Sequence, residues 1–432
     1  MGRSQGHVRG PIYNIRLSTV GATRPSETGT THEPTGLDLA MKLHYLTAAY
    51  IYSSETARDL TVAHVKEAMF VLFDQIAWTT GRFWRRDSGR PYIKCNDSGT
   101  RFVEGECDLT VEELLSKPDP SVDEFLVYHK PIGPELPFSP LIYVQMTRFK
   151  CGGLALGFSW ANIMGDSFSL LYAFSLWAKA ISGGKIYIPK TSNGDRRFWS
   201  LNPKVKDLNS IKRVDPVGDL WVTPNDKKMA NYCFNLSVAE QILPHFPANG
   251  DGYFPVFEIL AGIIWKCIAK VREEQEPVTV TIIRKDSNDL KPRGIRNSQM
   301  ISSVHVNFPV AEANVEELVK CIEKATDERC GIDEIGESCD GNLDFVVYGA
   351  KLTFMDLSEV DLYEAKVKDK SPESVYCNVE GVGEEGLVVV FPAANSEERV
   401  VTMTLPEEEM ERVKSEFKKC GLMIAPPCEI NG

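Results

Sequence analysis

The side chains of this sequence that could do chemistry are a few dispersed histidines and one polar pair, Asn162 and Asp166. A histidine titrates near neutral pH, so it can serve as a general base if it lies within hydrogen-bond reach of the proton to be removed. The histidines in the body of the chain do not cluster, and none lies beside the polar pair: His44, His64, His129, His245 and His305. Each is expected to be a surface residue or a hydrogen-bonded structural one.

Asn162 and Asp166 stand four residues apart, just after the apolar, glycine-punctuated run Cys151–Trp160. A side-chain amide has no useful protonation at neutral pH, so Asn162 is not expected to move a proton. Eleven cysteines are dispersed along the chain without a CxxC pair or a metal-type spacing, so we predict no metal site and expect reduced, mostly buried thiols.

The polar pair is expected to sit between a buried strand and a core helix. The pattern predicts strands over 139–149 and 153–160, joined by a tight turn at Lys150–Gly152, and a helix that opens at Asp166. Asp166 is the only formal charge between Cys151 and Ala178, but the glycines interrupt this run, which favours strand, turn and helix over a membrane span.

The rest of the chain alternates between strand and helix patterns without an internal repeat. Further helices are expected after the cap Thr61, over 257–271, from Asn314 and from Pro406. Further strands are expected at 12–20, 92–95, 100–104, 232–236, 278–283, 345–348, 374–379 and 386–391, with 92–104 as a hairpin. The fold class predicted from these elements is α/β.

Length and composition bound the protein class. At 432 residues the chain exceeds the size of one growing core, so two domains are expected. Periodicity vanishes in the proline-containing stretch 182–226, which gives an N-terminal domain 1–185, a crossover linker 186–226 and a C-terminal domain 227–432. The net charge of −12 argues against a nucleic-acid partner. The first residues contain no apolar signal segment, so a cytosolic location is expected.

The segment Cys151–Asp166 resembles the central motif of the plant BAHD acyltransferases, a glycine-led strand that runs into His-x-x-x-Asp. Other blocks match in type and order: Leu37–Leu39, Thr80–Phe83, Cys95–Gly99 and Phe257–Trp265. The resemblance spans most of the chain. It implies two chloramphenicol-acetyltransferase-like domains, each a mixed sheet with flanking helices, and a cleft between them.

In the BAHD mechanism the motif histidine deprotonates an acceptor hydroxyl or amine, which then attacks an acyl-CoA thioester. Aligned on Asp166, the residue at the histidine position is Asn162. The resemblance therefore implies that the chain has no catalytic residue at this position, and that Asp166 orients the frame. Loss of a general base typically costs about 10²–10⁴-fold in rate, or about 3–5 kcal/mol of barrier.

A second family signature, Asp-Phe-Gly-Trp-Gly, shapes a loop near the CoA end of the cleft. We align it with the segment that keeps only the first residue of the signature: Asp361, Leu362, Tyr363, Glu364 and Ala365. The cofactor-binding residues therefore stay unknown. No cofactor is expected, and the one ligand the resemblance implies is acyl-CoA, beside which Glu364 would be unfavourable.

The segments Asp38–Tyr45, Phe138–Leu141 and Tyr348–Phe354 narrow the resemblance to the eceriferum 2 / glossy 2 branch of the family. That branch implies a role in epicuticular wax synthesis. Its members assist the condensing enzyme of the fatty-acid elongase, a 3-ketoacyl-CoA synthase, at the cytosolic face of the endoplasmic reticulum. Contact would be through protein, for which the apolar residues Ile186, Tyr187, Ile188 and Phe198 are candidates.

Three functional hypotheses follow. The chain is an elongase accessory protein whose cleft binds acyl-CoA, an active acyltransferase with a diverged site, or a scaffold with an empty cleft. The first is the leading hypothesis, because the frame is retained while the base and the second signature are lost.

Overall fold

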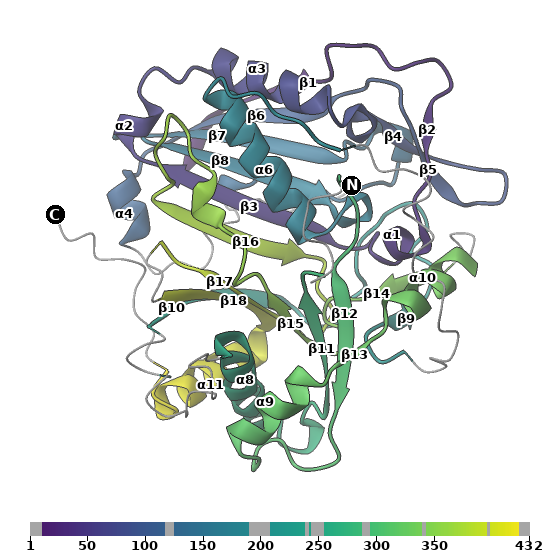
Figure 1. The fold of residues 1–432 in the computed structure, drawn as a ribbon, viewed down its shortest axis with the longest axis vertical. Helices are drawn as coiled ribbons and strands as arrows, with labels where there is room; N and C mark the ends of the chain where they lie inside the picture. Colours follow the sequence, from purple (N-terminus) through teal and green to yellow (C-terminus); the bar gives the residue numbers. More distant parts are fainter. Residues whose placement is uncertain are drawn as a thin grey trace, which may run out of the picture.

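Two mixed sheets, one above the other in Figure 1, contain most of the described strands. The computed structural model describes residues 11–116, 125–189, 208–237, 242, 255–286, 294–338, 343–394 and 398–422. Helices α3 and α6 cover the upper sheet, and helices α8, α9 and α11 lie beside the lower one.

The upper sheet has six strands in the order β1-β6-β7-β8-β3-β16, with β6 and β7 parallel and all other neighbours antiparallel. Its strands are β1 (Ile12–Val20), β3 (Tyr45–Tyr52), β6 (Thr100–Cys107), β7 (Ile142–Phe149), β8 (Leu154–Ala161) and β16 (Ser374–Glu380). Every residue of β3 and β8 is buried, so these central strands form the floor of the upper core.

The lower sheet has seven strands in the order β10-β18-β17-β15-β11-β12-β13, and β15 is parallel to both of its neighbours. Its strands are β10 (Met229–Ser237), β11 (Thr279–Arg284), β12 (Met300–His305), β13 (Thr326–Asp327), β15 (Leu352–Asp356), β17 (Leu387–Pro392) and β18 (Glu398–Pro406). Two small sheets pair β9 (Lys212–Val214) with β14 (Asp344–Val346), and β5 (Pro91–Lys94) with β2 (Thr31–His32) and β4 (Arg82–Arg85).

Several of the described helices begin at polar residues whose side chains cap the first turn, whereas others begin at a proline without such a cap. The α-helices are α1 (Gly36–Ala40), α2 (Ser54–Ala57), α3 (Val62–Phe73), α4 (Val111–Leu115), α6 (Ser167–Ile181), α8 (Val256–Arg272), α9 (Val315–Glu323), α10 (Arg329–Ser338) and α11 (Glu407–Lys419). The 3-10 helices are η1 (Ala77–Thr80), η2 (Leu136–Phe138), η3 (Asn162–Met164), η6 (Glu273–Gln275) and η7 (Leu362–Glu364). Thr61, for example, caps α3 as predicted, because its hydroxyl accepts from the His64 amide.

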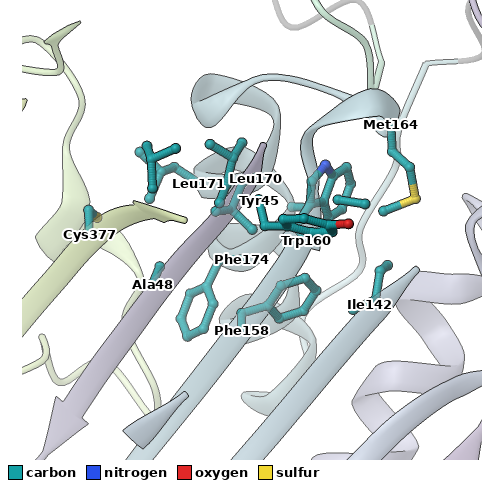
Figure 2. Close-up of a cluster of buried hydrophobic side chains, with 14 of the residues drawn as sticks. Tyr45, Ala48, Ile142, Phe158, Trp160, Met164, Leu170, Leu171, Phe174 and Cys377 are labelled. Carbon is teal, nitrogen blue, oxygen red and sulfur yellow. The ribbon is translucent and has the colours of Figure 1, made fainter. Parts of the chain in front are cut away.

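Helix α6 packs on the floor of the upper sheet through its aromatic face. The Phe174 ring stacks on Tyr50 of β3 at 3.6 Å, and Trp177 donates its indole N–H to the Val65 carbonyl of α3. Figure 2 shows Phe174 and Phe158 below Leu170 and Leu171, with Cys377 of β16 beside the two leucines. This packing fixes the first turn of α6, and with it the position of Asp166.

Most predicted elements are confirmed, with one pairing wrong. The strands over 12–20, 139–149, 153–160, 232–236, 278–283, 374–379 and 386–391 and the four further helices are all present, with ends shifted by a few residues. The predicted hairpin over 92–104 is wrong, because β5 pairs with β2 and β4 whereas β6 pairs with β1 and β7. The turn between them changes sheets instead of joining two neighbours.

One strand of the C-terminal half crosses into the upper sheet. β16 pairs along its whole length with β3, from Ser374 opposite Ile51 to Glu380 opposite Tyr45. The domain boundaries at 185 and 226 stay a prediction, but the two halves share this strand. The described part of the predicted linker also contains a strand, β9, so it is not wholly irregular.

Candidate functional site

Asn162 lies at the end of β8, in the first turn of η3, and is fully buried. Its side-chain nitrogen donates to Asn297 Oδ1 at 3.1 Å, and its side-chain oxygen accepts from the Tyr348 hydroxyl at 3.1 Å. Asn297 in turn donates to the Asn162 carbonyl at 2.8 Å and to Asp38 Oδ1 at 2.9 Å. The side-chain amide of Asn162 therefore connects segments that lie far apart in the sequence, and both its nitrogen and its oxygen are hydrogen-bonded.

Asp166 is also fully buried, and it contacts the two residues that follow Asn297 in the C-terminal half. Its Oδ1 caps α6 by accepting from the Ser169 amide at 2.9 Å. Its Oδ2 accepts from the backbone amides of Ser298 and Gln299 at 2.7 and 2.8 Å. Burial raises the pKa of this carboxyl, and the backbone donors oppose that shift. These contacts favour the predicted role of Asp166 as a structural residue.

His44 lies closest to this network among the predicted histidines, and it is a poor base. Its Nδ1 is 2.9 Å from the Gly381 carbonyl, and its Nε2 accepts from the Val347 amide at 2.9 Å. The first contact requires a proton on Nδ1, which leaves Nε2 as the acceptor. Burial lowers the pKa of His44 to about 3, so the ring is neutral and both of its nitrogens are engaged.

The pKa of His44 predicts that the protein loses stability in mild acid. The unfolded chain binds this proton near pH 6.5 and the folded chain only near pH 3, so stability is complete above pH 6.5 and falls as pH decreases below it. From pH 6.5 to pH 5 the expected loss from His44 is about 2 kcal/mol, at about 1.36 kcal/mol per pH unit. Urea unfolding at several pH values measures the slope, and a flat profile between pH 6.5 and 5 would contradict the assignment.

His129 is a histidine that no sequence pattern favours, and the structure brings it to the motif strand. Its Nδ1 lies 2.8 Å from the hydroxyl of Ser159, three residues before Asn162, and its ring packs against Tyr45 at 4.6 Å. Burial lowers its pKa to about 4. Nothing in the sequence links residues 30 positions apart in this way, so only the fold could reveal the pair.

Two further predicted histidines, His64 and His305, do not contact the polar pair. His64 is exposed and contacts the start of its own helix, as predicted from its place off the apolar face. His305 is exposed and pairs with Thr279 across two strands. His245 lies outside the described residues.

Three cavities follow one another along the seam between the two sheets. The first, of about 220 Å³, opens beside α6 and the loop before η7, and its wall includes Phe168, Leu171, Tyr172, Lys285, Arg296 and Leu362. The second, which we call the waist, measures only about 10 Å³ and shares Leu171 with the first. The third, of about 440 Å³, shares Thr47 and Val379 with the waist and contains His129.

Asn162 contributes to none of these three cavities, because its side chain is enclosed in the hydrogen-bond network. The side chains of the seam that could take part in chemistry are the two cations of the first cavity, Lys285 and Arg296, and His129 of the third. The cations of the first cavity are accompanied by Glu359 and Asp361, so its charge is balanced and its apolar wall dominates.

The segment Asp361, Leu362, Tyr363, Glu364 and Ala365 borders the first cavity through three of its members, Asp361, Leu362 and Ala365. Asp361 caps η7, and Glu364 pairs with Lys366 at 2.7 Å. That this segment is an eroded cofactor loop stays a prediction. The left-handed backbone that glycine favours occurs just beyond this segment, at Lys368 and Asp369 (φ 52° and 62°).

Among the described residues there is no group of histidine, cysteine or carboxylate side chains that could hold a metal ion. Within the same ranges, no helix is long and apolar enough to cross a bilayer. Of the apolar residues predicted to contact a partner, Tyr187 is exposed, Ile188 is buried and Phe198 lies outside the described residues.

Comparison with known proteins supports the fold expected from the sequence. A family pattern described as the Transferase family matches residues 35–420. Protein ECERIFERUM 26 of Arabidopsis thaliana is 81% identical, covering 99% of this chain and 100% of that protein. Protein ECERIFERUM 2 of the same plant is 36% identical, covering 94% of this chain and 98% of that protein. The crystal structure of vinorine synthase superposes with a TM-score of 0.72 at 15% identity, covering 96% and 99% of the two chains, which confirms the two-domain fold.

Proposed function

Since the chain belongs to the BAHD-type Transferase family, we propose that it is a non-catalytic member, an accessory factor for very-long-chain fatty acid elongation in cuticular wax synthesis. The observation that carries the proposal is the state of Asn162. The residue at the expected base position is an amide, it is fully buried, and its polar atoms are bound to Asn297 and Tyr348. A side chain in that state neither accepts a proton nor reaches an acceptor.

The retained cleft supports a binding role for an acyl-CoA. The first cavity has an apolar wall beside two cations and two carboxylates, which suits a hydrocarbon chain better than it suits a polyanion. An acyl chain would therefore lie in the seam, and its CoA moiety would extend towards solvent. Phe168, Leu171, Tyr172 and Leu362 would hold the chain by burying its methylene groups.

The partner in this proposal is the elongase condensing enzyme, a 3-ketoacyl-CoA synthase, at the cytosolic face of the endoplasmic reticulum. The contact is made by protein surface, for which the exposed ring of Tyr187 remains the candidate from the crossover. An accessory factor that presents or withdraws the growing chain would let the condensing enzyme reach longer products.

Co-expression in yeast tests the proposal. Wild-type protein together with a 3-ketoacyl-CoA synthase is expected to shift the acyl chains towards greater length than the synthase gives alone, as measured by gas chromatography of methyl esters. Asn162→Ala is expected to support the same shift at temperatures where it stays folded, because no proton transfer is lost. If wild-type protein leaves the acyl-chain profile unchanged, the accessory role is wrong. If wild-type protein lengthens the chains but a folded Asn162→Ala variant does not, Asn162 has a role in function beyond the one assigned here.

One observation favours a second candidate function, acyl-CoA-dependent transfer to a hydroxyl or amine. His129 borders the largest of the three seam cavities, which brings an imidazole to a space that an acceptor could enter, while burial lowers its pKa to about 4 and makes the ring a weak base. If the protein transfers acyl groups, His129→Gln should abolish CoA release from acyl-CoA plus acceptor, while His64→Gln, on the exposed surface, should leave it unchanged. On the leading proposal neither variant differs from wild type, because there is no transfer to lose.

A further inference from the structure

The waist of the seam contains a polar side chain that the proposed function does not yet use. Asn378 lies in β16, the strand that the C-terminal half contributes to the upper sheet, and it is 6% exposed. Its side-chain oxygen faces the Thr404 hydroxyl of β18 at 3.5 Å. Its side-chain nitrogen is buried and has no hydrogen-bond partner among the described residues. A buried donor without an acceptor is unfavourable, so its retention calls for an explanation.

The surroundings of this donor are mainly apolar. Figure 2 shows Leu170 and Leu171 of α6 beside Cys377, the neighbour of Asn378 in β16. The remaining wall of the waist is formed mainly by Leu46, Met355, Leu357, Val379 and Val389. Two hydroxyl groups also line the waist, and both are donated elsewhere: Thr47 donates to the Asn378 carbonyl at 3.2 Å, and Ser167 donates to Met355 Sδ at 3.4 Å.

This combination restricts the chemistry of a ligand that would satisfy the donor. No lysine, arginine or histidine is among the described residues that line the waist, so a carboxylate or phosphate would be buried without a counter-charge. A ligand rich in hydroxyl groups would meet a leucine and valine wall. The ligand that fits is a hydrocarbon chain with one neutral carbonyl oxygen, because such an oxygen accepts one hydrogen bond and carries no charge.

We propose that the side-chain nitrogen of Asn378 donates to the carbonyl oxygen of an acyl group that lies through the waist and joins the cavities on either side. The inference rests on the proposed function, since it names the point at which the bound acyl-CoA is held. The waist is narrow at about 10 Å³, and Leu171, which borders both the waist and the first cavity, is the side chain whose rotation would join them. Asn378 is in this scheme a positioning residue.

A pair of ligands that differ by one carbonyl tests the inference. Stearoyl-CoA and its thioether analogue S-octadecyl-CoA share the chain and the CoA moiety, but only the first has an acceptor for Asn378. Purified full-length wild type should bind stearoyl-CoA about tenfold more tightly in titration calorimetry, since one hydrogen bond is worth up to about one decade of affinity. Asn378→Leu should bind both ligands equally, with an affinity close to that of wild type for the thioether.

The controls separate a local effect from a general one. Asn235→Leu makes the same change on β10, at a residue that lines none of the three cavities, and should keep the preference for the thioester. Asn378→Leu should also have an unfolding midpoint no lower than that of wild type, because it removes an unpaired donor. A merely structural asparagine would give a lower midpoint and would not alter the preference between the two ligands.

The possible results distinguish this inference from the proposed function. Equal binding of both ligands by wild type, no binding of either, or a preference that persists in Asn378→Leu overturns the role of Asn378, even if wild-type protein lengthens acyl chains in yeast. A preference that depends on Asn378 sustains it, even if the yeast profile is unchanged and the accessory role fails.

Discussion

Asp166→Ala is expected to lower the free energy of unfolding by about 3–5 kcal/mol, the largest loss from a single substitution in the motif. The carboxylate accepts from three backbone amides, those of Ser169, Ser298 and Gln299, in a fully buried site. Alanine would leave these donors without acceptors, and each unsatisfied buried donor costs about 1–3 kcal/mol. Urea unfolding followed by tryptophan fluorescence measures the loss.

A matched control is available in Asp361, which has the same side chain and also caps a helix. Its carboxylate accepts from the Glu364 amide at 3.1 Å, but it is exposed and has no second set of buried donors among the described residues. Asp361→Ala should therefore cost no more than about 1 kcal/mol, as for an ordinary cap. Equal losses at both positions would mean that Asp166 acts only as a helix cap and does not join the two halves of the chain.

The sequence could predict elements whose signals are local. The cap at Thr61, the glycine turn after Phe149 and the apolar face of α8 each lie within one window of the chain, and each element formed as expected. The strand β3 has no such signal. All eight of its residues are buried, so the alternation that marks a half-buried strand is absent.

Pairing between elements could not be predicted in the same way. The turn between β5 and β6 has the composition of a hairpin turn, but the partners of both strands come from distant parts of the chain. β16 lies more than 320 residues from the strand it extends, β3, and nothing in either segment specifies the other. Register at this distance is fixed by the packing of the whole core.

For the site, the sequence could predict that Asn162 is not a general base. The hydrogen-bond partners of Asn162 could be found only in the structure. The substitution of a base by an amide is visible in one motif. The partners of that amide, Asn297 and Tyr348, come from more than 130 residues away, and so do two of the donors that hold Asp166. His129 and Asn378 are similar cases, because the neighbours that make each of them a candidate lie on elements distant in the sequence.

The family-branch segment Asp38–Tyr45 has a structural explanation of the same kind. Asp38 accepts from Asn297, and Lys42 forms an ion pair with Asp344 in which both side chains are almost completely buried. Asp344 belongs to β14, so the pair attaches the small β9–β14 sheet to the segment that leads into β3 of the upper sheet. Burial lowers the pKa of Lys42, and Asp344 opposes that shift.

Lys42→Met is therefore expected to cost about 3–5 kcal/mol, because it leaves the Asp344 carboxylate buried without a counter-charge. The double variant Lys42→Met/Asp344→Asn removes both charges and should recover at least about 2 kcal/mol of that loss, since the amide that replaces the carboxylate has no charge to desolvate. Lys370→Met breaks an exposed ion pair with Glu55 and should cost less than about 1 kcal/mol. Urea unfolding of wild type, Lys42→Met, Asp344→Asn and the double variant gives the coupling energy directly, and simple additivity of the two buried substitutions would show that the pair does not stabilise the junction.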